Sequence, residues 1–457
     1  MGSDSSPLGD LCDASRGITY GIVKVGDFIP GGVPVIRGGD IRDNRIVFDD
    51  HKRVSEEVSQ THKRTILQGG EIIINLISDP GHTAIVPPEN AGYNVSRDVA
   101  VIPLLDSVSH SYVNYVLKSP QAIAWFESRL QGSVTQKINL STLREYPVPL
   151  PPLPEQKAIA HILGTLDDKI ELNRRMNATL EGMAQALFKS WFVDFDPVID
   201  NALAADNPIP DELAPRAEVR KKALADGTAN REAAKPFPSA FQHTEELGWI
   251  PGGWQATAVS EAISVNPSTK LKKGDLAPFA DMKALPTFGY AIDGVIEKAY
   301  SGGAKFQNGD VLLARITPCL ENGKTGIVDF LTDSDPVGFG STEFIVLRGE
   351  GDLSTPFVAC LARDSNFRKH CVQSMIGSSG RQRVHNSCFD SYYLALPKDR
   401  DVVAKFNGLA VPAFAKADRQ SNENKTLTKL RDTLLPKLIS GELRIPEAEQ
   451  LTEESLA

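Results

Sequence analysis

The feature that most constrains the fold of this chain is an internal repeat. Residues 136–143, QKINLSTL, are echoed by residues 382–389, QRVHNSCF, and the same spacing of 246 residues relates Tyr146 to Tyr392. Upstream, GEIII at 70–74 resembles GDVLL at 309–313. A spacing of hundreds of residues excludes a solenoid, whose repeats are about 20–45 residues long. The sequence therefore predicts two copies of one plan, each a globular unit followed by a helix.

The globular part of each copy has the pattern of short strands. Apolar runs such as 72–77 (IIINLI) and 311–314 (VLLA) alternate with clusters of Gly, Asp and Pro, which is typical of strands joined by turns. One helical stretch comes late in each copy, at Ser111–Leu130 and Thr355–Ser374. We predict an α+β fold with two β-rich domains.

A long helical pattern follows each globular part. After a Pro-rich segment, apolar residues recur from Ile159 to Leu187 mostly at steps of three and four, as on one face of a helix. Such a helix is too long to bury in a small domain, so it needs a partner, which Val403–Leu438 supplies. An antiparallel pair would separate the two domains in a pseudo-two-fold arrangement. Pro412 and Pro436 are expected to bend or fray the second helix.

These patterns divide the chain into successive segments. Residues 199–246 are rich in Ala, Pro and charge, and we favour a linker there over an insertion with its own helix around Ala217–Leu224. The predicted segments are a first globular domain at 1–150, a central long helix at 151–198, the connecting segment at 199–246, a second globular domain at 247–400, a C-terminal long helix at 401–445 and a tail at 446–457.

Composition narrows the class of protein. A formal charge of −9 argues against a generally basic nucleic-acid coat, although locally basic faces remain compatible with DNA binding. None of the five cysteines belongs to a CxxC pair, which argues against a zinc site or a disulfide frame. The sequence has no signal-peptide pattern and no run of about 18 apolar residues. We expect a soluble, cytoplasmic protein that does not enter a membrane.

Several motifs together resemble the specificity subunits of type I restriction-modification systems. The segment 150–160, LPPLPEQKAIA, looks like the start of that family's central region, and 187–197, LFKSWFVDFDP, continues it. GWIPGGW at 248–254 is similar to the usual entry to the second recognition domain, and LLPKLISGEL at 434–443 resembles the C-terminal end. The resemblance covers nearly the whole chain in the order recognition domain, helix, recognition domain, helix.

The resemblance implies a binding and assembly protein with no catalytic residue and no metal site. In the family, each target recognition domain binds one half of a bipartite target in double-stranded DNA, and the helices hold the two domains at a set spacing. The implied partners are two methyltransferase (modification) subunits, which dock on the helices, and restriction motor subunits. No cofactor is expected in this chain, and S-adenosylmethionine, ATP and Mg are expected on the partners.

Three polar clusters are candidates for contact with DNA, because bases and phosphates are bound by Arg, Lys, Asn, Gln and hydroxyl side chains. Two equivalent loops in the two copies form the first cluster, and both could instead be ordinary surface turns. Three arginines interleaved with Asp40 and Asp43 form the second, and these acids could pair with them. A polar loop after a strand is the third. The predicted DNA-binding residues are Ser133, Thr135, Gln136, Lys137, Arg381, Gln382 and Arg383 in the loops, then Arg37, Arg42 and Arg45, then Arg315, Asn322 and Lys324.

Catalytic motifs are incomplete in this sequence. Asn266-Pro267-Ser268-Thr269 lacks the second proline and the aromatic residue of an adenine methyltransferase, and Gly323-Lys324-Thr325 lacks the opening glycine of a phosphate-binding loop. Two alternatives from other classes remain. A self-contained nuclease or methyltransferase would be active as the purified chain alone. A coiled-coil scaffold would give no salt-dependent DNA shift in the assembled complex.

Overall fold

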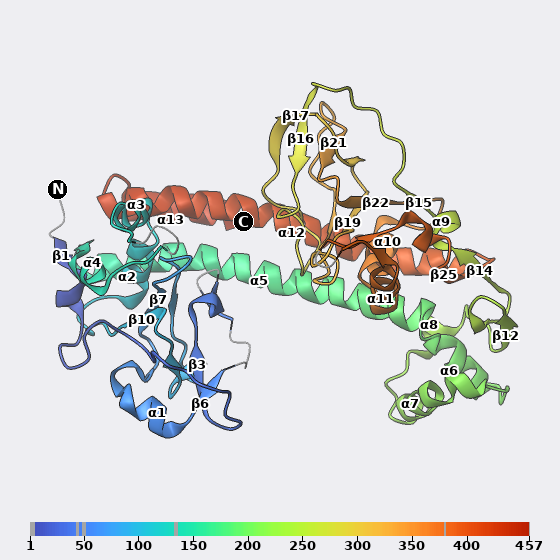
Figure 1. Cartoon of the computed structure of the whole chain (residues 1–457), viewed down its shortest axis with the longest axis horizontal. Coiled ribbons are helices and arrows are strands. Elements are labelled where there is room, and N and C mark those ends of the chain that lie inside the picture. Colours follow the sequence, from blue (N-terminus) through green and yellow to red (C-terminus); the bar gives the residue numbers. More distant parts are fainter. Residues whose placement is uncertain (1–4, 43–44, 48–51, 132–135, 379–380, 457) are drawn as a thin grey trace. The chain divides into compact units, whose positions relative to one another are not determined.

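The computed structural model describes residues 5–42, 45–47, 52–131, 136–378 and 381–456, and the chain divides into two compact units (Figure 1). The first unit consists of Met1–Glu171 with Asn424–Ala457, and the second consists of Leu172–Glu423. The two long helices are α5 (Leu153–Phe192) and α12 (Asp401–Ser440). Each unit therefore contains a part of both helices.

A four-stranded antiparallel sheet forms the centre of the first unit. Its order in space is β2 (Thr19–Tyr20), β10 (Val99–Ile102), β7 (Ile72–Asn75) and β8 (Thr83–Ile85). Every residue of β7 and β10 is buried, as the continuous apolar runs predict. The predicted late helix is two helices, α2 (His110–Leu117) and α3 (Pro120–Glu127), because Ser119 caps the second one.

The second unit repeats this plan strand for strand. Its central sheet has the order β15 (Ile263–Val265), β22 (Phe344–Gly349), β19 (Val311–Ala314) and β20 (Thr325–Ile327), again antiparallel throughout. The helices α10 (Thr355–Arg363) and α11 (Ser365–Gln373) correspond to α2 and α3, and Asp364 caps the N-terminus of α11. The two copies predicted from the sequence thus have the same sheet order and the same helix pair.

Smaller strand pairs recur as well. In the first unit β3 (Val33–Ile36) runs parallel to β9 (Asn94–Val95), and β1 (Ser5–Pro7) pairs with β11 (Pro147–Pro149). Their counterparts are β16 (Leu276–Ala280) beside β21 (Gly338–Gly340), and β14 (Trp254–Ala258) beside β25 (Tyr393–Pro397). The other short elements are β4 (Ile41–Arg42), β5 (Arg45–Ile46), β6 (Arg53–Val54), β12 (Phe241–Thr244), β13 (Gly248–Pro251), β17 (Ile296–Ala299), β18 (Lys305–Phe306), β23 (Met375–Ile376), β24 (Arg383–Val384), α1 (Glu56–Thr61), α4 (Leu140–Glu145) and α9 (Val259–Ala262).

Helices α5 and α12 pack against each other in an antiparallel sense, as predicted. Higher residue numbers on α5 meet lower numbers on α12, since Asp167 binds Arg431 in the first unit, whereas Asn177 binds Ser421 in the second. In each unit, apolar residues of both helices belong to one hydrophobic core. These include Leu163 and Leu434 in the first unit, and Phe188 and Phe406 in the second. Contrary to the expectation of fraying, α12 continues through Pro412 and Pro436. Burial of alanines near Pro412 (Ala410 and Ala417) and of leucines near Pro436 (Leu434, Leu435 and Leu438) outweighs the lost backbone hydrogen bonds.

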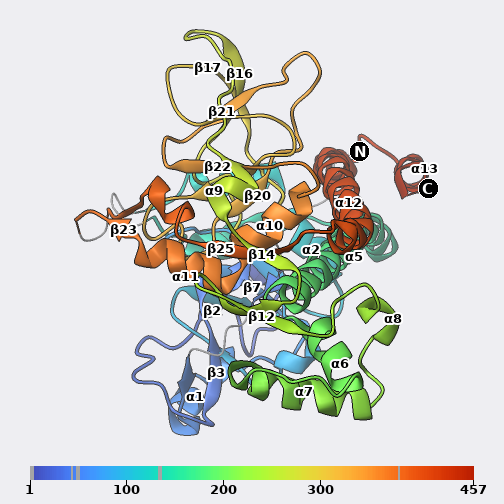
Figure 2. The same cartoon turned by 90° about the vertical axis from the view of Figure 1, so that its right-hand side faces the viewer.

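The segment for which we favoured a linker is helical. It contains α6 (Asp196–Ala204), α7 (Ala214–Ala225) and α8 (Arg231–Ala234), and α6 and α7 lie side by side (Figure 2). Arg216 and Arg220, one turn apart on α7, bind the buried carboxylates of Asp196 and Asp200, one turn apart on α6, with Nε–Oδ1 distances of 2.6 and 2.8 Å. Two matched ion pairs therefore order a segment whose composition suggested flexibility.

The predicted C-terminal tail also forms a helix, α13 (Ile445–Leu456), whose Ala448 is buried in the core of the first unit. Among the helices that the structure describes, none combines the length and the apolar character needed to cross a membrane.

Candidate nucleic-acid interface

The two predicted polar loops are held by the same backbone hydrogen bonds in both units. In the first unit, Ile138 N–H donates to Leu76 O at 2.9 Å and Ser78 N–H donates to Gln136 O at 3.1 Å. In the second unit, Val384 N–H donates to Arg315 O at 2.9 Å and Thr317 N–H donates to Gln382 O at 3.1 Å. Each loop is thus fastened to the segment that follows the central strand, β7 or β19. The repeat extends from the sequence motif to individual backbone contacts.

Equivalent cations lie at the same place in these loops. Lys137 forms a bridge with Ile77, and Arg383 forms a bridge with Ile316. Gln136, Lys137 and Arg381 are exposed to solvent. Within the described parts of the chain, the Lys137 ammonium and the Arg381 guanidinium have no hydrogen-bond or ion-pair partner. Ser133 and Thr135 lie outside the described residues.

Arg383 differs from Lys137 because it is already bound to a carboxylate. Its Nη2 lies 2.6 Å from Oε1 of Glu343, and its Nε lies 2.9 Å from both carboxylate oxygens. These hydrogen bonds raise the pKa of Arg383 above its usual value. Glu343 was not predicted as part of the site, since no motif links it to a residue 40 positions away.

Among the described residues, the three arginines of the first unit's cluster differ in their partners. Arg42 and Arg45 are paired across the β4–β5 ladder. Arg45 forms an ion pair with Glu171 on α5, whereas Arg42 donates to the carbonyl of Gly39 at 2.7 Å, its one side-chain hydrogen bond to a residue that the structure describes. Arg37 lies 3.5 Å from Asp40, which also accepts from the Arg37 backbone. Pairing with Asp40, one of the two interpretations of this cluster, therefore applies to Arg37, and Arg45 is bound to a different acid.

The third cluster supports neighbouring segments. Arg315 donates through Nη2 to Val384 O at 2.7 Å, which holds β24 in place. Lys324 donates through Nζ to Met282 O at 2.7 Å. The side chain of Asn322 is exposed. Of this cluster, Asn322 is the member whose side chain is not engaged with the protein among the described residues.

The candidate residues have the chemistry expected of a binding surface. Its exposed groups are cations and amides, which bind phosphates and base edges. Within the described ranges, no group of three His, Cys, Asp or Glu side chains is placed to hold a metal ion.

Part of the chain matches a family model, and the chain is similar to several known proteins. The model of the type I restriction modification DNA specificity domain matches residues 2–182. The chain is 26% identical over 438 residues to the type I restriction enzyme HindI specificity subunit of Haemophilus influenzae, covering 90% of this chain and 94% of that protein. It is 24% identical over 463 residues to the MjaIX specificity subunit of Methanocaldococcus jannaschii, covering 97% and 94%. Among solved structures, the type I S subunit from M. genitalium aligns with a TM-score of 0.48 and 15% identity over 95% of both chains.

Proposed function

We propose, on the premise that this chain belongs to the family of type I restriction-modification specificity subunits, that it selects the DNA sequence on which its complex acts. The specificity subunit is the non-catalytic member of such a complex. The observation that carries the proposal is the repeated loop, fastened by the same hydrogen bonds in both units. Two equivalent polar loops suit a target made of two half-sites, each bound by one domain.

The long helices support a spacer and docking role. Their antiparallel packing joins apolar residues and polar pairs in both units, so it resists sliding of one helix along the other. In the proposal, the helix pair sets the distance between two binding domains and offers a surface on which two modification subunits dock. Restriction motor subunits would join the same complex for cleavage.

The finer assignments complete the proposal. The recognition domains span 1–150 and 247–400, the helical segments span 151–198 and 401–445, and 199–246 and 446–457 are accessory segments. S-adenosylmethionine, ATP and Mg bind to the partner subunits, and the complex works in the cytoplasm, where it meets double-stranded DNA.

The DNA contacts are proposed in two groups. Gln136, Lys137, Arg381 and Arg42 approach DNA directly, since their polar groups face solvent. Arg383 and Arg45 approach DNA only after leaving Glu343 and Glu171. Asn322, whose side chain is exposed, belongs with the direct contacts. The remaining candidates contribute backbone or hydroxyl groups or support the loops, namely Ser133, Thr135, Arg37, Gln382, Arg315 and Lys324.

The test is co-expression of the chain with its modification subunits, followed by genome-wide mapping of methylated adenines. A bipartite methylated motif is expected. Lys137→Ala and Arg381→Ala should each lower methylation about tenfold, the effect of losing roughly 1.4 kcal/mol of binding. Lys63→Ala and Lys398→Ala, at exposed positions outside the proposed interface, are the controls.

Two outcomes count against the proposal. Methylation that is unchanged in both loop variants would remove these residues from the interface. A complex that assembles but methylates no bipartite motif would reject the function itself.

A further inference from the structure

The first unit contains a cavity that none of its described DNA-binding candidates lines. Its volume is about 520 Å³, which lies within the roughly 300–1,000 Å³ of small-molecule sites. The walls come from α2, α3, the loop between β7 and β8, and α12. Phe126, Leu130 and Leu435 are apolar parts of this wall, and Ile123 is 46% exposed although it is a large apolar residue. The cavity therefore has room and an apolar surface for a metabolite-sized molecule.

One cation in the cavity wall, Lys118, has neither a hydrogen-bond nor an ion-pair partner among the described residues. Lys118 caps the C-terminal end of α2, and its Nζ lies 5.1 Å from the centroid of the Tyr115 ring. In the described part of the chain, this ammonium makes no hydrogen bond and no ion pair. The carboxylate whose charge acts on it, Asp167, already accepts from Tyr115 Oη at 2.7 Å and from Arg431 Nη1 at 2.6 Å. Burial lowers the pKa of Lys118 to about 7, an effect that Asp167 opposes and Arg431 reinforces.

The other charged groups around the cavity are mostly paired with one another. On α12, Arg431 also binds Asp432 at 2.7 Å. In the loop between β7 and β8, Nε2 of His82 lies 2.9 Å from Asp79. Glu127 on α3 is exposed to solvent. Lys118 is thus the cation of this described wall whose charge the protein itself leaves uncompensated.

The second unit shows that the fold does not require an uncompensated cation at this position. Lys118 directly follows α2, and Arg363, 245 residues further along the chain, is the last residue of α10. Like Lys118, Arg363 lies against a tyrosine, with its Cζ 4.4 Å from the centroid of the Tyr290 ring. However, Arg363 donates to the carbonyls of Thr287, Gly289 and Thr325. The same position therefore holds a cation bound by its own chain in one unit and an unbound cation beside a cavity in the other.

We propose that the cavity beside Lys118 binds a small organic anion. The anionic head, a carboxylate or a phosphate, accepts hydrogen bonds from the Lys118 ammonium, and the apolar body packs against Phe126, Leu130 and Leu435. A charge-assisted hydrogen bond in a partly buried site is stronger than one in water. The bound anion favours the protonated form of Lys118, whose charge the folded chain otherwise leaves unpaired.

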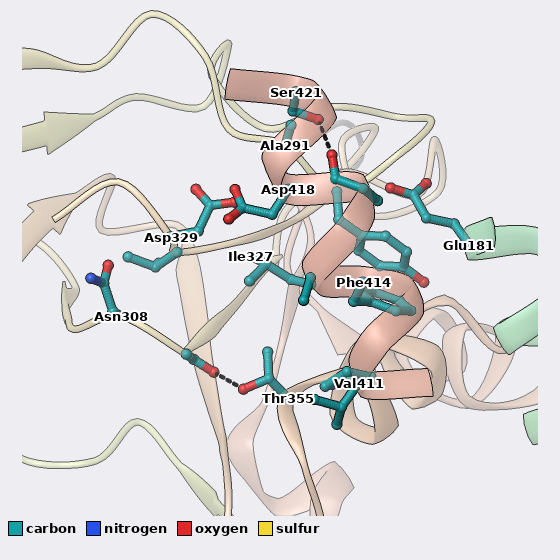
Figure 3. A pocket seen from close by; sticks show the side chains of 16 residues that line it. Glu181, Ala291, Asn308, Ile327, Asp329, Thr355, Val411, Phe414, Asp418 and Ser421 are labelled. Atoms are coloured by element: carbon teal, nitrogen blue, oxygen red, sulfur yellow. Dashed lines mark hydrogen bonds between the residues drawn. The ribbon is translucent and has the colours of Figure 1, made fainter. Parts of the chain in front are cut away.

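A cavity of about 310 Å³ in the second unit has the opposite character (Figure 3). Glu181, Asp329 and Asp418 line it together with apolar residues such as Ile327 and Phe414. Among its described lining residues there is no Lys or Arg. The described lining of this cavity therefore lacks the cation that the proposed anion site requires.

Labelling of the full chain tests the proposal. Pyridoxal 5′-phosphate carries an anionic group, an aromatic ring and an aldehyde, which condenses with a neutral amine with loss of water, and borohydride then reduces the imine. At pH 7.5, Lys118 should be labelled about tenfold faster than the exposed Lys398, because a buried lysine is more often neutral. Peptide mass spectrometry gives both rates.

Protection and affinity then identify the ligand chemistry. Phenylacetate and phenyl phosphate should protect Lys118 from labelling, and inorganic phosphate, which has no apolar body, should protect it less. Which of the two phenyl compounds protects more distinguishes a carboxylate from a phosphate ligand. By calorimetry, Lys118→Arg should keep phenylacetate binding, whereas Lys118→Met should reduce it about tenfold, and Lys398→Met should change nothing.

Three results would overturn the proposal. The first is labelling of Lys118 that is no faster than labelling of Lys398, and the second is labelling of Lys118 against which none of the three anions protects. The third is shielding of Lys118 in a complex with the modification subunits when no anion is added, which would show that a partner protein fills the cavity instead.

Discussion

Arg431 of α12 donates to Asp167 of α5 across 2.6 Å, and the hydroxyl of Tyr115 on α2 donates to the other oxygen of the same carboxylate at 2.7 Å. The side chains of this ion pair are only 20% and 25% exposed. One carboxylate therefore joins both long helices to the globular part of the first unit. Its two oxygens accept from two different elements, which fixes the register of the helices at this level.

Arg431→Met should destabilise the protein by about 1–3 kcal/mol, because it leaves a largely buried carboxylate without its cation. Urea unfolding of the full chain measures the change. Lys429→Met, at an exposed position on the same helix, is the matched control and should have little effect. Equal effects of the two substitutions would mean that the ion pair has no special role.

Glu343→Gln should strengthen DNA binding of the assembled complex about two- to fivefold, since it removes a negative charge from the interface and frees Arg383 to contact phosphate. The dependence of affinity on salt concentration should become steeper. Fluorescence anisotropy at several salt concentrations measures both quantities, with Glu261→Gln on α9 as the control. Weaker binding would instead indicate that Glu343 positions Arg383 for contact with DNA.

The pKa of Lys118 predicts a change of stability at alkaline pH. Burial lowers this pKa from 10.5 to about 7, so between these values the unfolded chain holds a proton that the folded chain has released. The contribution of Lys118 to the free energy of unfolding therefore rises with pH across this window, by at most about 1.4 kcal/mol per pH unit for one proton. Lys118→Met should be more stable than the unmodified chain at pH 6, and this advantage should shrink towards pH 10. A difference that does not depend on pH would contradict the shift.

The pKa of Glu181 predicts the opposite pH dependence: at lower pH, its contribution to the free energy of unfolding falls as the pH rises. Burial raises the pKa of its carboxyl group from 4.5 to about 7, although Arg363 and the Tyr290 N–H act to lower it. Between pH 4.5 and 7 the folded chain holds the extra proton, so the contribution of Glu181 to stability is full below pH 4.5 and is lost as the pH rises through 7. Glu181→Gln should remove this loss. Thermal unfolding at pH 5 and pH 8 tests it, and equal melting-temperature differences from the unmodified chain at both values would refute it.

The elements with a local signal could be predicted. The apolar runs of β7 and β19 and the periodic positions of α5 carry their structure in neighbouring residues. The segment around α6 and α7 could not be predicted, because its order comes from Asp196 and Arg216, 20 positions apart, and not from its composition. Similarly, α12 passes through Pro412 and Pro436 because tertiary burial outweighs local preference.

The candidate site, too, could be predicted from the sequence only in part. The repeated loop motif is sufficient to identify Lys137 and Arg383 as equivalent positions. Whether a cation is available to contact DNA depends on whether an acidic residue far away in the sequence forms an ion pair with it. Glu343 binds Arg383 and Glu171 binds Arg45, whereas Lys137 and Lys118 have no ion-pair partner within the described chain.

The sequence by itself determined the duplication and the two long helices, because both show as patterns and motifs of neighbouring residues. Only the tertiary structure decided which charges are compensated. Ion pairing depends on separations of a few ångströms between side chains that lie tens or hundreds of residues apart, and no periodicity along the chain records those distances.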